Sequence, residues 1–253
     1  MQKRYRPLTD NQWQVIKPFL NWQRKRKLSL RRIFNAILYI TRTGIQWRNL
    51  AQTCFPAWTA VYYYFRQWSL DGTLAAINLA LIQLERRRKG RKALPSLGLV
   101  DSQSVKLAPM IFEHRGVDGD KKVNGRKRHI FTDTGGRIYA VHVHAANRHD
   151  SPQGVHLLQA IGPLEGRLKK VLADKSYRGT FAAAVAQRGL KFEVPERPEH
   201  RVGFALEKQR WVVERSLAWF NFYRRAARDW EHTVESSAAF LLLANISMVL
   251  AKM

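Results

Sequence analysis

Hydrophobic positions in the first 84 residues recur at helical spacing, in short segments that polar caps and glycines separate. Helices are predicted after Thr9, between Ser29 and Gly44, at residues 55–70 and at residues 74–84, with a helical turn at residues 47–50. Gln12 lies three residues after Thr9, which is the spacing of a capping box. The pattern therefore predicts a small, all-helical N-terminal region.

Beyond residue 96 the hydrophobic period changes to two. Strands are predicted at residues 97–106, 128–132, 137–145, 168–173 and 191–194, and helices at residues 151–161, 179–188, 207–228 and 234–252. Residues 133–136 (DTGG) have the composition of a hairpin turn. Strands and helices in this order predict a mixed α/β fold, in which a mixed sheet is flanked by helices.

The two periodicities meet at a charge run, residues 85–92, which Pro95 follows. Such a run beside a proline is typical of a domain boundary. We therefore expect a helical domain at residues 1–85, a basic linker at residues 86–96 and an α/β domain at residues 97–253.

Charge changes the picture of the helical region. The 253 residues include 44 Lys and Arg against 19 Asp and Glu, a net charge of +25, and residues 1–92 contain 19 basic and 3 acidic side chains. This excess favours a polyanionic partner and a DNA-binding module similar to a helix-turn-helix. Periodicity alone would equally allow a packing or dimerisation domain with solvated basic faces.

The composition also limits the compartment. Cys54 is the single cysteine, so no disulfide can form within the chain, which is typical of a reducing compartment. The most apolar stretch, residues 238–251, is too short and too polar to span a bilayer and is predicted to be a core helix. We therefore expect a cytoplasmic protein without membrane association.

Asp101 lies within a predicted strand, and Asp174 directly follows another. Glu214 lies within the predicted helix 207–228. A carboxylate in a half-buried strand is costly unless something pairs with it. If the first and fourth strands are neighbours, Asp101 and Asp174 face each other. A few carboxylates with open positions suit Mg²⁺, and two such ions support displacement at phosphorus.

Glu214 also has a simpler explanation. On a continuous helix it shares a polar stripe with Glu207, Arg210, Asn221 and Arg225. An ion pair between Arg210 and Glu214 on a solvated face would account for this stripe without chemistry.

A basic cluster at residues 120–129 (DKKVNGRKRH) precedes a strand and is suited to a phosphate backbone, although an ordinary exposed loop has the same composition. The eight histidines have none of the spacings of a zinc-protease motif, and we predict that they are structural.

Taken together, these motifs resemble the DDE transposases of bacterial insertion sequences, in particular the IS5-like branch of the IS4/IS5 superfamily. The matching pieces are residues 100–106 (VDSQSVK), 118–129 (DGDKKVNGRKRH), 146–151 (ANRHDS), 172–179 (LADKSYRG) and 211–220 (WVVERSLAWF), then Arg224 and Arg225. Residues 5–13 and 44–50 resemble the helical domain that precedes the catalytic core in this branch.

The resemblance implies an RNase H-like catalytic core. It implies that Asp101, Asp174 and Glu214 are catalytic and bind Mg²⁺ or Mn²⁺. Arg210 matches the arginine of the family's helix signature, whereas Glu207 and Asn221 replace its tyrosine and lysine. The residues expected on DNA are Lys121, Lys122, Arg126, Lys127, Arg128, His129, Lys175, Arg178, Arg210, Arg215, Arg224 and Arg225.

The implied function is metal-dependent cleavage and strand transfer at the terminal inverted repeats of an insertion sequence. The implied partner is double-stranded DNA, bound by a homodimer or higher multimer in the bacterial cytoplasm, at the nucleoid. Two alternatives remain open: a DNA-binding regulator or inactive remnant, and a metal-dependent nuclease without strand transfer.

Overall fold

The structure is a computed structural model that describes residues 6–21, 23, 27–164, 166–195 and 210–253. The N-terminal part is helical: α1 (Asp10–Ile16), η1 (Lys17–Phe19), α2 (Leu30–Thr43), η2 (Trp47–Asn49), α3 (Trp58–Leu70) and α4 (Thr73–Arg88). Local signals account for the ends of the first two α-helices. Thr9 and Gln12 form the predicted capping box, Ser29 caps α2, and Gly44 ends α2 with a φ of 71°.

The sheet has six strands: β1 (Leu97–Lys106), β2 (Gly116–Val117), β3 (Asn124–Asp133), β4 (Ile138–Ala145), β5 (Lys170–Leu172) and β6 (Lys191–Glu193). Their order is β2-β3-β1-β5-β6, and β4 also pairs with β3. β1 is antiparallel to β3 and parallel to β5, and β5 is parallel to β6. The mixed sheet is confirmed, and β1 and β5, which correspond to the first and fourth predicted strands, are neighbours.

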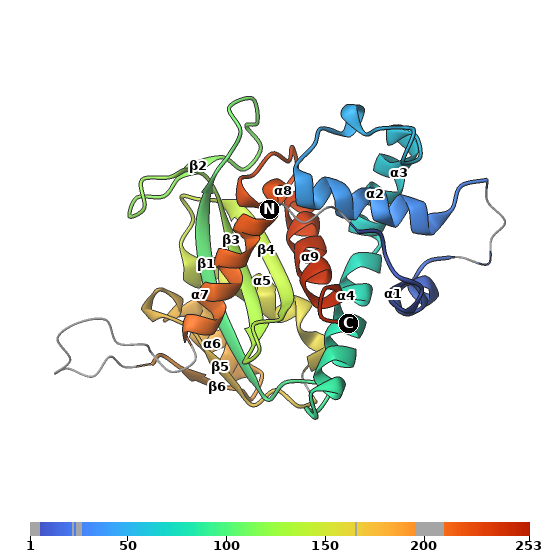
Figure 1. Ribbon diagram of the computed structural model, residues 1–253. Coiled ribbons are helices and arrows are strands. Elements are labelled where there is room, and N and C mark those ends of the chain that lie inside the picture. The colour runs from blue at the N-terminus through green and yellow to red at the C-terminus, as the bar shows by residue number, and fades with distance from the viewer. Residues whose placement is uncertain (1–5, 22, 24–26, 165, 196–209) are drawn as a thin grey trace.

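Helices cover both faces of this sheet (Figure 1). α5 (Asp150–Ala160) and α6 (Thr180–Gln187) lie on one face, and α7 (Arg210–Trp219) and α9 (Val234–Leu250) lie on the other. Side chains of β1 alternate between the two faces. Leu99 packs in a cluster with residues of α7, whereas Val100 packs in a cluster with residues of α5 and α6. Odd-numbered β1 positions therefore face α7.

The N-terminal helices and the α/β part share one hydrophobic core. α9 packs against α2, α3 and α4 as well as β4. Its Phe240 ring lies 4.7 Å from that of Phe65 and 6.0 Å from that of Trp47. The residues 238–251 are therefore part of a core helix, as predicted. No helix in the described part of the chain is long and apolar enough to cross a membrane.

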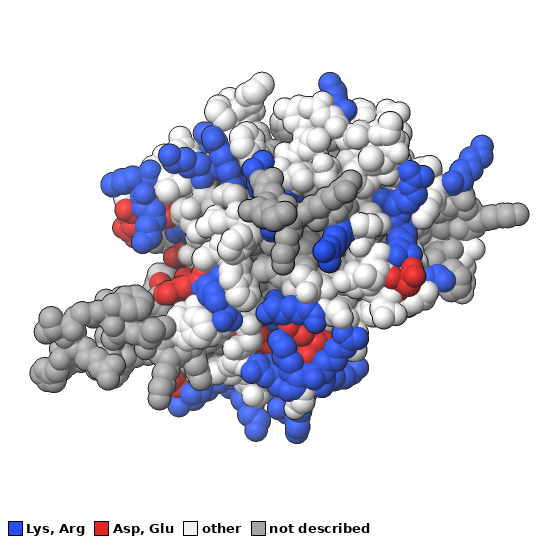
Figure 2. Space-filling model, in the orientation of Figure 1, with Lys and Arg blue, Asp and Glu red and all other residues white. Residues whose placement is uncertain are grey.

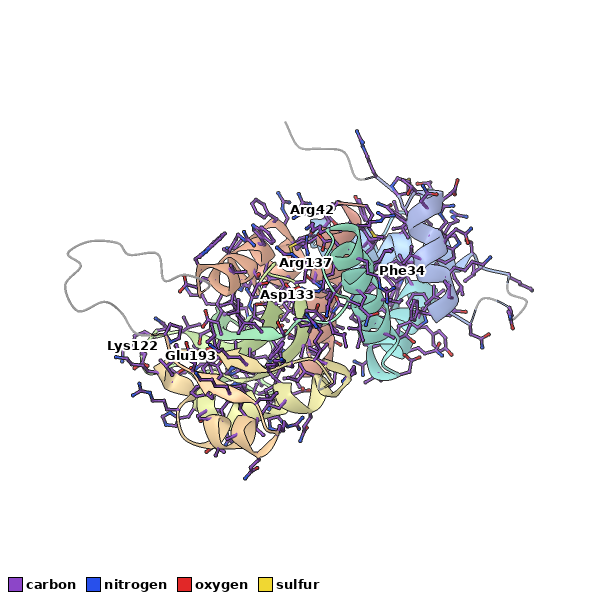
Figure 3. The ribbon with its side chains drawn as sticks, turned by 90° about the horizontal axis from the view of Figure 1, so that it is seen from below. Phe34, Arg42, Lys122, Asp133, Arg137 and Glu193 are labelled. Carbon is purple, nitrogen blue, oxygen red and sulfur yellow. The ribbon has the colours of Figure 1, made fainter. Side chains whose placement is uncertain are left out.

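α4 continues into the expected linker because ion pairs hold its last turns to the β3–β4 hairpin. Glu85 accepts from Arg137 at 2.5 and 2.7 Å, and Arg86 pairs with Asp133. Figure 3 shows Asp133 and Arg137 close together beside this helix. Residues 86–88, expected at the start of the linker, are thus helical, and Arg86 is buried.

The predicted continuous helix at residues 207–228 is wrong where it is described, and residues 207–209 lie outside the described part. α7 ends at Trp219, and η5 (Phe220–Phe222), an extended Tyr223 and α8 (Arg224–Ala227) follow. Arg128 of β3 reaches this break, where its guanidinium lies 4.8 Å from the Phe220 ring centre and donates to the Ala226 carbonyl. Arg225 therefore does not lie on the stripe of Glu214.

Candidate functional site

Asp101 and Asp174 come from adjacent parallel strands. The register pairs Leu99 of β1 with Leu172 of β5, and each acid lies two residues further along its own chain segment. Both carboxylates are half-buried. Asp101 lies in the middle of β1 and Asp174 lies just beyond the end of β5, so the structure brings these two predicted residues to neighbouring positions where β5 ends.

Local hydrogen bonds orient both carboxylates. Oδ1 of Asp174 accepts from the backbone N–H of Ser176 at 3.0 Å and from the Ser176 hydroxyl, so that Asp174 caps the short helix η4 (Lys175–Tyr177). Oδ1 of Asp101 accepts from the backbone N–H of Ser102 at 2.8 Å. Hard divalent cations prefer oxygen ligands, and carboxylate oxygens are ligands of this type.

Glu214 lies on α7, which packs against β1 and β3 on the face of Asp101. Val213 and Leu217 are buried, whereas Glu214 is exposed. Among the described residues, no three acidic, histidine or cysteine side chains are arranged so that they could hold a metal ion. The convergence of Asp101, Asp174 and Glu214 on a metal therefore stays a prediction.

The opposite face of the sheet carries a buried polar cluster. His129 of β3 contacts the hydroxyl of Tyr177 and the ring of His144 of β4, and the His142 and His156 rings stack at 4.5 Å. Burial lowers the pKa of His144 to about 4 and that of His129 well below its usual value. The sequence predicted structural histidines but gave Tyr177 no role. The sequence signal that could have indicated this cluster was the alternation of His142 and His144 on one predicted strand.

Three residues predicted to bind DNA are buried instead, which corrects that prediction. Arg126 has no exposed surface and donates to the carbonyls of Glu113, Glu231 and His232 and to the Asp229 carboxylate. Arg128 and His129 are 3% and 0% exposed. A phosphate cannot reach these side chains, and the basic cluster looked like a DNA surface only because composition does not reveal burial.

Three more predicted DNA contacts are engaged within the protein. Lys127 Nζ lies 2.8 Å from Asp150 and 3.5 Å from Asp118, and Arg225 Nε lies 2.6 Å from Glu231. The Arg215 guanidinium lies between the Trp211 and Trp219 rings, and burial lowers its pKa. These side chains have fewer donors left for a phosphate than the sequence indicated.

The remaining predicted contacts are exposed: Lys121, Lys122, Lys175, Arg178 and Arg224. The Arg210 side chain lies outside the described part. Figure 2 shows further basic side chains gathered at the end of α4, where residues 87–92 are exposed. The sequence assigned this stretch to a linker and missed it as a candidate surface, although its charge was visible.

Two segments of this chain match known protein families. Residues 8–78 match a family described as "Putative transposase of IS4/5 family", and residues 92–250 match the "Transposase DDE domain". A Burkholderia cepacia protein, "Putative transposase for insertion sequence element IS402", is 35% identical over 133 residues, covering 49% of this chain and 62% of that protein. The match thus spans less than two thirds of that relative's length.

Among solved structures, the Mos1 strand transfer complex aligns over 90% of this chain and 80% of that chain. The identity is 10% and the TM-score is 0.28. These values are too low to indicate a common fold or a common function.

Proposed function

This chain belongs to the family of transposase DDE domains, and from that membership we propose that it cleaves DNA at the ends of an insertion sequence and joins the cut strand to target DNA. One observation supports this most directly. Asp101 and Asp174, far apart in sequence, lie at neighbouring positions where β5 ends, two residues beyond paired positions of adjacent parallel strands.

Asp101, Asp174 and Glu214 would hold the divalent ion, which we propose to be Mg²⁺ or Mn²⁺. When bound, such an ion supplies Lewis-acid activation of the attacking oxygen and stabilises the leaving oxygen. The protein orients the carboxylates of Asp101 and Asp174 through hydrogen bonds from the backbone N–H groups of Ser102 and Ser176.

The partner is double-stranded DNA, bound by a homodimer or higher multimer at the nucleoid. The exposed side chains of Lys121, Lys122, Lys175, Arg178 and Arg224 would contact phosphates. The helices before residue 86 would read the inverted repeats, and the α/β part from residue 97 would contain the active site.

The test uses Asp101→Asn, Asp174→Asn and Glu214→Gln, with Glu235→Gln as a control because Glu235 is exposed on α9. Changes next to metal ligands already cost 10–100-fold, so we expect each ligand change to reduce cleavage of end-containing DNA by at least about 100-fold. DNA binding, measured by gel shift, should persist. A triad variant that cleaves as fast as the control would refute the assignment.

The products distinguish this function from the alternatives. Joined species between element ends and target DNA indicate strand transfer, whereas free ends alone indicate a nuclease. Binding of the ends without any cleavage by the unmodified protein would indicate a regulator or an inactive remnant.

A further inference from the structure

A chain of hydrogen bonds links η4 to the neighbouring strands β3 and β4. The Tyr177 hydroxyl lies 2.5 Å from Nδ1 of His129, and Nε2 of His129 lies 2.7 Å from Nε2 of His144. Nδ1 of His144 lies 2.8 Å from the carbonyl oxygen of its neighbour Ala145. Tyr177 and His129 have no exposed surface, and His144 is 5% exposed.

The direction of each hydrogen bond follows from the last group in the series, which is the carbonyl oxygen of Ala145. A carbonyl oxygen only accepts, so Nδ1 of His144 carries the hydrogen and its Nε2 is an acceptor in the neutral ring. His129 must then donate from Nε2 and accept at Nδ1, which leaves Tyr177 to donate its hydroxyl hydrogen. The depressed pKa values of both histidines agree with neutral rings. The chain therefore has one arrangement of hydrogens.

Packing leaves the Tyr177 ring little freedom. A Cβ added at Gly154 of α5 would lie 2.8 and 2.9 Å from two carbons of this ring, so the helix approaches it as closely as a glycine allows. The Phe181 ring lies 5.2 Å away on another side. Both contacts hold the ring where its hydroxyl meets His129.

Two members of this hydrogen-bond chain, Tyr177 and His129, lie close to the predicted metal ligands in sequence or in strand register. Tyr177 is the last residue of η4, whose first turn Asp174 caps. His129 pairs in register with Ser102, the residue after Asp101. Burial raises the pKa of the Tyr177 hydroxyl, and the charges of Asp150, Asp101 and Asp174 raise it further.

We propose that the Tyr177–His129–His144 chain is a positioning device, which fixes the turn that carries Asp174 relative to Asp101 on β1. The metal ion of the proposed function would then meet two carboxylates that are already placed. Tyr177 and His129 are positioning residues, since they act through Asp174 and touch no substrate. The inference rests on the proposed function for its metal and on the hydrogen bonds for its geometry.

The test compares Tyr177→Phe with Tyr139→Phe. Tyr139 is also a buried tyrosine, but it lies near Asp133 at the hairpin end of the sheet. Mn²⁺ alone is titrated into each full-length protein, and the free ion is followed by electron paramagnetic resonance. We expect Tyr177→Phe to weaken Mn²⁺ binding by about 10-fold, the usual effect of removing a group that orients a ligand. Tyr139→Phe should bind as the unmodified protein does.

Hydrogen exchange of the metal-free proteins separates this inference from the proposed function. Amides of residues 175–178 should exchange faster in Tyr177→Phe and in Gly154→Ala, which displaces the ring but keeps the hydroxyl. Unchanged exchange and unchanged Mn²⁺ affinity in Tyr177→Phe would overturn the inference. If the unmodified protein binds no Mn²⁺, the proposed metal site fails, whereas the exchange result still decides whether the chain positions the turn.

Discussion

At the scale of single residues, the main difference from a simple DNA-binding surface is that several of the basic side chains are buried. Arg126 is the clearest case, because its guanidinium has no exposure and contacts three carbonyls and one carboxylate. Such an arginine joins the loop around Glu113 to the segment before α9. Sequence alone could not separate Arg126 from its exposed neighbours Lys121 and Lys122, because all three are basic residues of the same short charged segment.

Replacing Arg126 should therefore destabilise the fold. Arg126→Met removes the ion pair between Arg126 and the buried Asp229 carboxylate, and we expect the free energy of unfolding to fall by about 3 kcal/mol. Urea denaturation followed by circular dichroism measures this change. Lys121→Met, at an exposed position, should stay within about 0.5 kcal/mol of the unmodified protein. Equal effects of the two variants would contradict the structural role of Arg126.

The buried histidines predict how stability depends on pH. Burial lowers the pKa of His144 to about 4 in the folded protein, whereas the unfolded value is about 6.5. Between these values the unfolded chain binds more protons, so stability rises with pH through this window and falls as pH decreases. Lys127, His142 and His156 surround the pair and disfavour further positive charge, while Asp150 partly offsets them.

We expect the free energy of unfolding to fall by about 1 kcal/mol or more between pH 6.5 and pH 5. Urea denaturation at the two pH values tests this. His144→Gln removes one titrating ring and should reduce the slope. A stability that stays constant from pH 6.5 to pH 5 would show that these rings are not held neutral.

At the scale of elements, local signals predicted some helix ends, and distant contacts decided others. Thr9, Ser29 and Gly44 gave the ends of helices because caps act within a few residues. The extension of α4 to Arg88 and the break after Trp219 depend on Arg137 and Arg128, which come from the sheet. No periodicity within either helix contains that information.

The same division applies to the candidate site. The sequence predicted that Asp101 and Asp174 lie on neighbouring strands, and the strand order agrees. It gave Tyr177 no role, because the link from Tyr177 to His129 and His144 depends on three segments meeting on the second face of the sheet.

The contact between α4 and the hairpin gives a prediction at this scale. Glu85→Gln removes the charge that pairs with Arg137 and Lys89, and Arg137 is only 2% exposed. We expect a loss of about 3 kcal/mol of stability because a buried guanidinium loses its counter-charge. Faster amide exchange at residues 84–88 should accompany it. Glu235→Gln is the control, and equal exchange in both variants would contradict the expected anchoring.

At the scale of the whole molecule, the expected division into domains does not correspond to two separate cores. The buried cluster that includes Ile37 and Phe65 continues through Phe240 to Leu157 and Phe181. α9 therefore completes the packing of helices that precede it by more than half of the chain.

A shared core predicts cooperative unfolding. Tryptophan fluorescence reports on the local surroundings of tryptophans 13, 47, 58 and 68 in the helical part and of tryptophans 211, 219 and 230 in the α/β part, whereas circular dichroism reports on secondary structure throughout. We expect the urea transitions seen by tryptophan fluorescence and by circular dichroism to coincide, as in a two-state protein. Two separated transitions would show that the helical part unfolds independently of the sheet.

The contact of α9 with α2, α3 and α4 also has a consequence during synthesis on the ribosome. At about 5–20 residues per second, the ribosome needs on the order of 10–30 seconds to proceed from the end of α4 to the end of α9. During that time the early helices lack the surface that completes their packing. The nascent chain therefore exposes apolar side chains of these helices, and the helical part completes its packing only after the α/β part has been translated.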